Sequence, residues 1–267
     1  MRTSCILLAA AVLLSAGPCR AVAVPPPQVH GESAILVDVQ SGRVLYHKNS
    51  RAPRAVASTQ KLLTALIIAE DGNLDSPVTI QPSDTAVAPT KLYLKAGQTY
   101  SRQDLLRALL VKSANDVACA LARDNAGSVG NFAAKMNERA RAMGATSSQF
   151  VNPNGLPAEG QYSTARDMAI IARNAYANPV LRGIVATKSF EFRFADGRVR
   201  EMVNTNRVLR TAPFCTGMKT GYTDAAGHCL VSSGHGDRRD VIAVVLGSNK
   251  SRVYNDSQKL LEWGLQL

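Results

Sequence analysis

Three short clusters of polar residues lie far apart in the chain and could together carry nucleophilic chemistry. They are Ser58-Thr59-Gln60-Lys61, Ser113-Ala114-Asn115 and Lys219-Thr220-Gly221. Taken singly, each is an ordinary feature, because serine and asparagine commonly cap helices and lysine is usually a solvated surface residue. The elements that position the clusters therefore decide whether they can act together.

The first cluster stands at the start of a helix that is predicted over residues 58–70. The residues after Lys61 are apolar on almost every face of that helix, so it should be buried. Burial and the positive end of the helix both favour the neutral amine of Lys61. Residues three apart on a helix are neighbours, so Lys61 can take the proton of Ser58. The same helix end would stabilise a developing oxyanion, which predicts an activated serine without histidine.

The second cluster falls at a predicted break between two helices. A serine and an amide two residues apart on a short loop can both face one cleft. There Ser113 could relay a proton, and Asn115 could bind a substrate amide and orient Lys61.

The third cluster lies on a predicted strand. Strand alternation places Lys219 and Gly221 on one face and Thr220 on the other. A cation and a hydroxyl beside a glycine, which allows close approach of a backbone, suit the C-terminal carboxylate of a peptide.

The composition is that of a globular protein. The chain has 267 residues, of which 46% are hydrophobic and 19% are charged. This composition excludes a chain that is disordered, collagen-like or coiled coil throughout. The net charge of +11 comes without aromatic residues interleaved with basic runs, so we expect no nucleic-acid partner. The basic balance suits an anionic environment such as a cell-wall polymer or a membrane surface, or else a solvated surface without a specific partner.

Residues 1–23 have the pattern of a secretory signal peptide. Arg2 precedes a short apolar run, and Ala21-Val22-Ala23 fits the cleavage rule. No later apolar run approaches the ~20 residues of a membrane span. We therefore expect residues 24–267 to form the exported domain, soluble after signal cleavage, in the periplasm or cell-wall space.

Cysteine and histidine usage indicates neither a metal nor a cofactor. The chain contains no CxxC or HExxH, and its four histidines lack metal-ligand spacing. Cys119, Cys215 and Cys229 remain after signal removal. If residues 223–227 form a hairpin loop, Cys215 and Cys229 fall out of register, which predicts that they are not bridged.

Hydrophobic periodicity and turn residues predict an α+β fold: a mainly antiparallel sheet flanked by helices, with a helical insertion at about residues 73–180. The predicted strands are 34–39, 44–48, 189–194, 199–202, 217–222, 228–233 and 241–246. The predicted helices include 58–70, 115–125 and 251–265, with others opening after Ser101, Ser128 and Thr164. An isolated hairpin is marginal, so the first hairpin should join the C-terminal strands in one sheet.

The three clusters, in this order, carry a family resemblance. S-x-x-K, S-x-N and K-T-G form the set found in penicillin-binding proteins and class A β-lactamases. The chain resembles the low-molecular-mass penicillin-binding proteins, the serine D-alanyl-D-alanine carboxypeptidases, over about residues 30–265. Residues 150–157, 162–169 and 217–223 support this resemblance. It implies a penicillin-binding transpeptidase/β-lactamase-like fold.

The resemblance implies catalytic roles for two clusters. Ser58 would form the acyl-enzyme and Lys61 would be its base. Ser113 and Asn115 would form the second wall of the site and assist proton transfer. The family often has glycine where this chain has Ala114, a change that we expect to be tolerated.

The resemblance also implies how substrate is held. Lys219 and Thr220, beside Gly221, would bind the terminal carboxylate, with a contribution from Arg252. The backbone N–H groups of Ser58 and Tyr222 would form the oxyanion hole. Many relatives continue into a β-rich domain and an amphipathic membrane anchor, and because this chain ends at Leu267 we expect no C-terminal membrane anchor.

The implied activity is removal of the terminal D-alanine from peptidoglycan stem peptides, with β-lactams as covalent inhibitors. A DD-endopeptidase that cuts cross-links is the main alternative. A class A β-lactamase needs a carboxylate for deacylation, usually in an E-x-x-L-N loop before K-T-G, and none of the acids there begins one. A non-catalytic β-lactam sensor or wall-binding module stays open, whereas a Ser-His-Asp hydrolase lacks its G-x-S-x-G.

Overall fold

A five-stranded antiparallel sheet forms the centre of the molecule, which a computed structural model describes over residues 24–267. The predicted signal peptide lies outside the described residues. The strand order is β2-β1-β9-β8-β7, and β1 pairs with both β2 and β9. The first hairpin therefore joins the C-terminal strands, as predicted. The bounds are β1 Ser33–Asp38, β2 Val44–Lys48, β7 Cys215–Thr223, β8 Gly227–His235 and β9 Asp240–Ser248.

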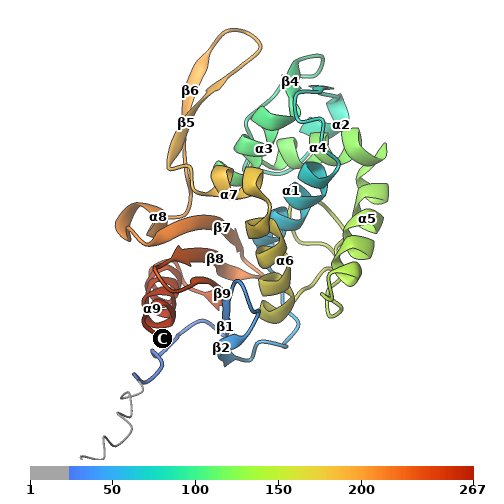
Figure 1. Cartoon of the computed structure of the whole chain (residues 1–267). Helices are drawn as coiled ribbons and strands as arrows, with labels where there is room; N and C mark the ends of the chain where they lie inside the picture. Colours follow the sequence, from blue (N-terminus) through green and yellow to red (C-terminus); the bar gives the residue numbers. More distant parts are fainter. Residues whose placement is uncertain (1–23) are drawn as a thin grey trace, which may run out of the picture.

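Helices cover both faces of this sheet (Figure 1). Helix α9 (Arg252–Gln266) packs on one face, where Leu260 and Leu261 meet Val245 in one apolar cluster. Helix α6 (Ala165–Ala177) packs on the other face, within a larger cluster that also includes the central helix α1 (Lys61–Glu70). Because the sheet is covered twice, β9 is apolar along almost its whole length, which explains the continuous hydrophobic run of the sequence.

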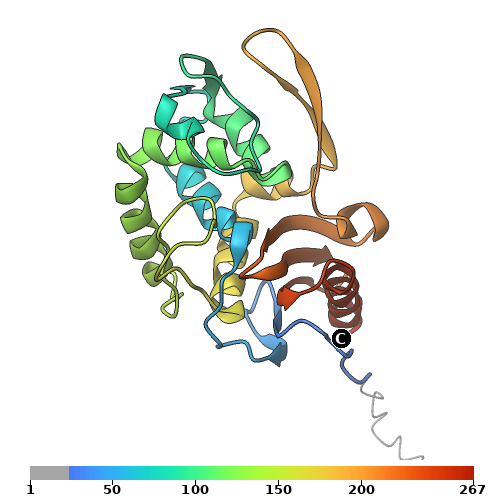
Figure 2. The same ribbon diagram turned by 180° about the vertical axis from the view of Figure 1, so that it is seen from behind.

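Most of the remaining elements lie on the α1 side of the sheet, whereas α8 (Val208–Thr211) packs beside β7 and α9. The others are η1 Ala57–Gln60, β3 Pro77–Thr79, α2 Pro82–Thr85, β4 Thr99–Ser101, α3 Arg102–Val111, α4 Asn115–Ala126, α5 Val129–Ala142, α7 Pro179–Val185, β5 Ser189–Arg193 and β6 Val199–Val203. Strands β5 and β6 form a hairpin that extends away from the sheet (Figure 2). The predicted caps Ser101, Ser128 and Thr164 each accept a backbone N–H three residues on.

The β7–β8 register bears on the predicted absence of a bridge between Cys215 and Cys229. Tyr222 stands opposite His228, and Gly221 opposite Cys229. A register shift near the start of β7 then places Cys215 opposite Gly234. The three cysteines of the described region are free and buried, as predicted for Cys215 and Cys229.

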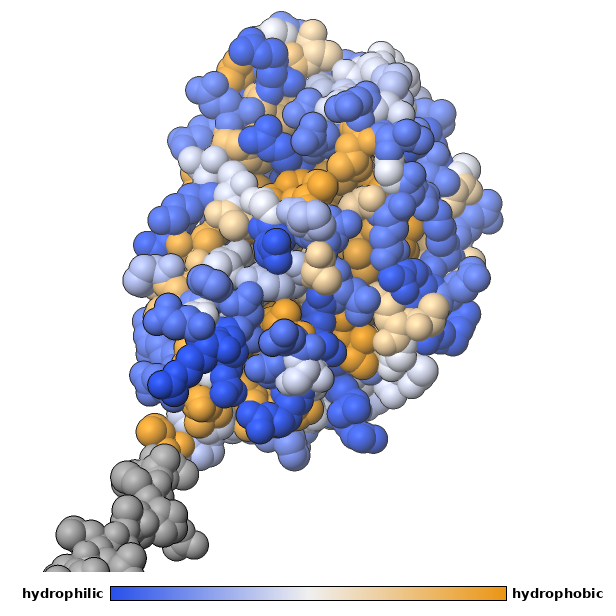
Figure 3. Space-filling view, viewed as in Figure 1, coloured by the Kyte–Doolittle hydropathy of each residue, from blue (hydrophilic) through white to orange (hydrophobic). Residues whose placement is uncertain are grey.

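The surface drawn in Figure 3 is mostly hydrophilic, with hydrophobic residues in small separate patches. Within residues 24–267, none of the helices combines the length and apolarity that crossing a membrane requires.

Candidate active site

The turn that carries Ser58 is a short 3-10 helix, η1, that runs directly into α1. The sequence predicts a regular helix from Ser58, but side-chain bonds tighten this turn instead: Thr59 Oγ1 donates to the Val56 carbonyl at 2.6 Å. Gly155 packs against it so closely that a Cβ would lie 2.1 Å from the Ala57 oxygen. The loop around Gly155 therefore clamps the turn, and only glycine fits there.

The Lys61 amine stands at the centre of the site and is fully buried. Its Nζ lies 2.8 Å from Ser58 Oγ, 2.7 Å from Asn115 Oδ1 and 2.8 Å from the Asn154 carbonyl oxygen. A neutral amine has two N–H groups and one lone pair. If the two carbonyl oxygens accept the N–H groups, the lone pair is left for the hydroxyl proton of Ser58.

Electrostatics favour the neutral form of Lys61. Burial lowers the pKa of Lys61 well below its ordinary value, and the nearby charge of Lys219 lowers this pKa further. The environment that the sequence predicts for Lys61, an apolar helix start, is therefore the one observed, with a second lysine added.

The second cluster forms the wall opposite β7. Ser113 lines the cleft in a left-handed backbone conformation, with φ of 70°. Asn115 begins α4, and its side-chain amide donates to the Ala88 carbonyl at 3.1 Å while its backbone N–H donates to Thr90 at 2.7 Å. These two bonds fix Asn115 so that its Oδ1 faces Lys61.

The third cluster lies on β7, at the edge of the sheet. Thr220 Oγ1 donates to Thr205 Oγ1 at 2.7 Å, and a Cβ on Gly221 would lie 2.9 Å from the backbone nitrogen of Ser58. Along β7, Lys219 and Gly221 are buried while Thr220 is half-buried, which agrees with the predicted alternation. Thr220 and Gly221 both line the cleft, because β7 is an edge strand whose exposed backbone edge forms part of the cleft wall.

Lys219 is buried behind this wall and does not line the cleft. Its Nζ donates to the Thr220 carbonyl oxygen at 2.9 Å. Burial lowers the pKa of Lys219 to about 7. Charge on this amine therefore carries a free-energy cost that a bound carboxylate would offset.

The cleft between these walls has a volume of about 330 Å³. Its lining comprises Ser58, Thr90, Lys112, Ser113, Thr205, Thr220, Gly221, Tyr222, His228, Cys229, Val253 and Tyr254. The rings of Tyr222 and His228 stack with centroids 4.4 Å apart. Burial, followed by Lys250 and Arg207, lowers the pKa of His228. Among the described residues that line the cleft, none is an Asp or Glu, the residue type that a class A β-lactamase uses for deacylation.

Arg252 is another predicted site residue that does not line the cleft. It is exposed at the start of α9, and it is the following residues Val253 and Tyr254 that line the cavity.

Three residues that position the site were not predicted. The Asn154 carbonyl accepts from Lys61, and Thr205 accepts from Thr220. The buried Asp116 carboxylate accepts the backbone N–H groups of Leu92 and Tyr93 at 3.0 and 2.9 Å, which orders the segment next to Thr90. Asn154 stands in a stretch that carried the family resemblance, whereas the sequence holds no comparable signal for Thr205.

No set of three His, Cys, Asp or Glu side chains within residues 24–267 is grouped as a metal site.

The site unites a serine, a buried lysine and a K-T-G edge strand on an α+β scaffold, which is the arrangement of a serine acyl-transfer enzyme. The family described as D-alanyl-D-alanine carboxypeptidase (Peptidase_S11) matches residues 20–250, and the chain belongs to this family. The predicted family is thereby confirmed.

Curated relatives agree with this assignment. The chain is 36% identical to the D-alanyl-D-alanine carboxypeptidase DacB2 of Mycobacterium tuberculosis, over 91% of this chain and 85% of the relative. It is 33% identical to DacF of Bacillus subtilis, over 84% of this chain and 59% of the relative. The chain thus spans little more than half the length of that longer relative.

Solved structures confirm the predicted fold class. A D-alanyl-D-alanine carboxypeptidase from Mycobacterium tuberculosis superposes with a TM-score of 0.87 at 34% identity, covering 92% of this chain and 95% of that one. The Streptomyces K15 DD-transpeptidase superposes with a TM-score of 0.86 at 29% identity, covering 91% and 100%. Together these relatives support a serine-type DD-peptidase function for the domain.

Proposed function

We propose that this protein removes the terminal D-alanine from peptidoglycan stem peptides through an acyl-enzyme on Ser58. The observation that carries the proposal is the position of Lys61 Nζ, held by the oxygens of Asn115 and Asn154 within 2.8 Å of Ser58 Oγ. A lysine that burial keeps neutral, with its lone pair available to a serine hydroxyl, is an activating base.

In the acylation step, Ser58 Oγ attacks the carbonyl carbon between the two D-alanines while its proton passes to Lys61 Nζ. The backbone N–H groups of Ser58 and Tyr222 donate to the resulting oxyanion. When the tetrahedral intermediate collapses, the C–N bond breaks and the leaving amine takes a proton, with Ser113 as the relay from Lys61. Water then repeats the attack on the ester and releases Ser58.

The free carboxylate of the terminal D-alanine sets the orientation of the substrate. In this proposal it lies along β7, where Thr220 donates a hydroxyl and Lys219 supplies positive charge from behind the strand. Arg252, at the start of α9, would contribute by turning its exposed side chain toward the cleft.

The proposal extends to inhibitors and location. A β-lactam carries a carboxylate and a strained amide in a similar relation, so it should acylate Ser58 covalently. Export by the signal peptide of residues 1–23 would place the enzyme in the periplasm or cell-wall space, where its substrate is found.

The test is incubation with purified pentapeptide monomers and cross-linked dimers, followed by mass analysis. Free D-alanine from monomers is expected. Cleavage of dimers in preference to monomers would make the enzyme an endopeptidase. No product from either substrate, with a lasting penicillin adduct, would favour a sensor.

Intact-mass spectrometry after penicillin treatment identifies the nucleophile. One adduct is expected on the wild type and on a Ser83→Ala control, whose serine is exposed and does not line the catalytic cleft. Ser58→Ala should show none. An adduct that persists on Ser58→Ala would refute the assignment of Ser58.

A further inference from the structure

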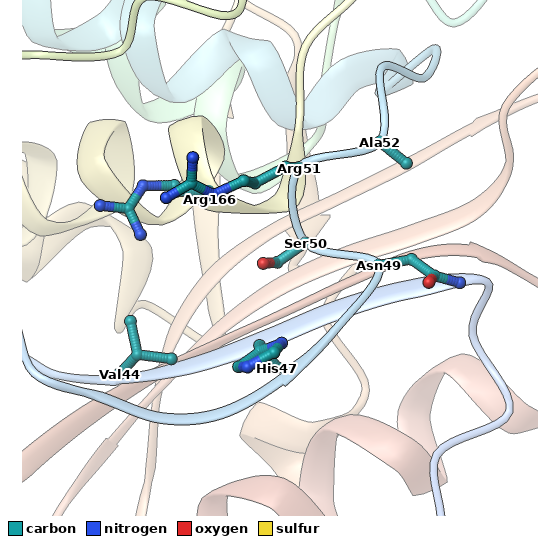
Figure 4. A pocket seen from close by; sticks show the side chains of 7 residues that line it. All are labelled: Val44, His47, Asn49, Ser50, Arg51, Ala52 and Arg166. Atoms are coloured by element: carbon teal, nitrogen blue, oxygen red, sulfur yellow. The ribbon is translucent and has the colours of Figure 1, made fainter.

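A second cavity, of about 520 Å³, lies beside β2, at the opposite edge of the sheet from the catalytic cleft (Figure 4). Four inter-strand steps separate β2 from β7, which is roughly 19 Å at ~4.8 Å per step. The cavity is lined by Val44, His47, Asn49, Ser50, Arg51, Ala52 and Arg166, and none of these residues lines the catalytic cleft.

Two solvent-exposed arginines, Arg51 and Arg166, line this cavity. The guanidinium groups of Arg51 and Arg166 extend over the same part of it (Figure 4). A hydrogen bond from the Arg166 N–H to the carbonyl of Ser50, the residue before Arg51, joins the two segments. Among residues 24–267, no carboxylate lies within ion-pair distance of Arg51 or Arg166. Two guanidinium groups are therefore gathered without a counter-ion.

The position of Arg166 makes this gathering unfavourable for the fold alone. It lies in the first turn of α6, where the positive end of the helix repels a cation. The neighbouring carboxylate of Asp167 is buried, and its oxygen accepts hydrogen bonds from Ser147 and Ser148 rather than pairing with either arginine. An anion placed between Arg51 and Arg166 would remove both repulsions.

A smaller cavity of about 140 Å³ extends the same groove along α6. It shares Val44 and Arg166 with the first cavity and adds Arg173, two helical turns further on. Arg173 Nε donates to the Val39 carbonyl at 2.9 Å, which holds its guanidinium at the end of the groove. A third positive charge thus lies along the path of any extended ligand.

We propose that this groove is a second binding site, which takes a phosphate group carried on a larger ligand. Two guanidinium forks can donate together to one tetrahedral oxyanion, and Ser50 and Asn49 supply further polar groups. Val44 and Ala52 give the cavity an apolar side that suits the organic part of the ligand. The site goes beyond the proposed peptidase reaction and does not depend on it.

Calorimetric titration of the full domain with inorganic phosphate at low salt tests the site. The variant is Arg51→Gln with Arg166→Gln. The control is Arg141→Gln with Lys259→Gln, which removes the same charge from exposed positions elsewhere. We expect saturable phosphate binding that the site variant weakens at least tenfold and the control variant leaves within twofold. Equal binding by the wild type and the site variant, or no binding by the wild type, overturns the proposal.

Two further binding measurements identify the source and the chemical class of the anion. Co-sedimentation with phosphatidylglycerol vesicles, against phosphatidylcholine, that depends on Arg51 and Arg166 points to a lipid headgroup. Phosphate binding without vesicle binding points to a soluble phosphate-bearing ligand. Acetate that binds as tightly as phosphate overturns the choice of phosphate.

A stability measurement excludes a merely structural role. If Arg51 and Arg166 serve a ligand, Arg166→Gln should melt no lower than the wild type in phosphate-free buffer. A clear drop in melting temperature would show that the fold itself needs this arginine and would refute the proposal.

Discussion

Replacing Lys219 by methionine should raise the stability of the protein at low pH while removing most of its acylation activity. The lysine is fully buried, and its Nζ has one hydrogen-bond acceptor, the Thr220 carbonyl. Burial lowers the pKa of this amine from 10.5 to about 7. The folded protein therefore binds a proton at Lys219 less readily than the unfolded chain does.

The sign and size of the effect follow from linkage. Below pH 7 the amine is protonated in both states, and the folded state bears the full cost of the buried charge. That cost is roughly 5 kcal/mol, because the pKa falls from 10.5 to about 7 and a change of one in pKa corresponds to ~1.36 kcal/mol. It decreases as pH rises from 7 to 10.5 and is roughly 2 kcal/mol at pH 9. The gain in the free energy of unfolding that Lys219→Met brings over the wild type should thus be about 3 kcal/mol larger at pH 5 than at pH 9.

Urea unfolding of the wild type, of Lys219→Met and of an exposed control, Lys259→Met, at pH 5 and pH 9 measures this difference. Loss of the bond to Thr220 costs about 1 kcal/mol at both pH values, so it cancels in the comparison. Acylation by penicillin should fall at least a hundredfold in Lys219→Met, because the carboxylate loses its cation. A stability difference that does not change with pH would show that protonating Lys219 in the folded protein carries no free-energy penalty. That result would refute the reasoning.

Three other substitutions probe the positioning of the nucleophile. Lys61→Arg keeps a cation but cannot act as a base, so the acylation rate should fall by about 10²–10⁴, whereas near-normal acylation would remove Lys61 from the mechanism. Gly155→Ala places a Cβ 2.1 Å from the Ala57 oxygen at a φ of 85°, and thermal melting should show a loss of several kcal/mol, on the order of the larger core substitutions. Asp116→Asn removes one of the acceptors for Leu92 and Tyr93, and urea unfolding should show a loss of about 1–3 kcal/mol.

The main elements of the fold could be predicted because local signals agreed with one another. The capping serines and threonine, the two-residue periodicity of the C-terminal strands and the apolar run of β9 each have a direct physical cause. The joining of β1 to β9 followed from the marginal stability of an isolated hairpin. The register shift that moves Cys215 opposite Gly234 depends on local backbone geometry and has no counterpart in the pattern of residues.

The site was predictable only in part, for a similar reason. Ser58 and Lys61 are local neighbours, so helix geometry alone brings them together. The contacts of Asn154 and Thr205 join segments that are distant in the chain, and no spacing rule connects them. Strand alternation described the faces of β7, but it could not show that the exposed backbone edge of this strand forms part of the cleft wall.

In the proposed mechanism, the two buried lysines of the site would give the substrate a role in its own activation. The charge of Lys219 lowers the pKa of Lys61, yet burial opposes a charge on either amine. A bound carboxylate near Lys219 offsets the burial cost at that amine and favours its protonated form. That positive charge would lower the pKa of Lys61, against the opposite effect of the carboxylate's own charge, and so favour a free lone pair for the proton of Ser58. A substrate without the carboxylate would leave a smaller fraction of Lys61 in the neutral form. It should therefore be acylated more slowly as well as bound more weakly.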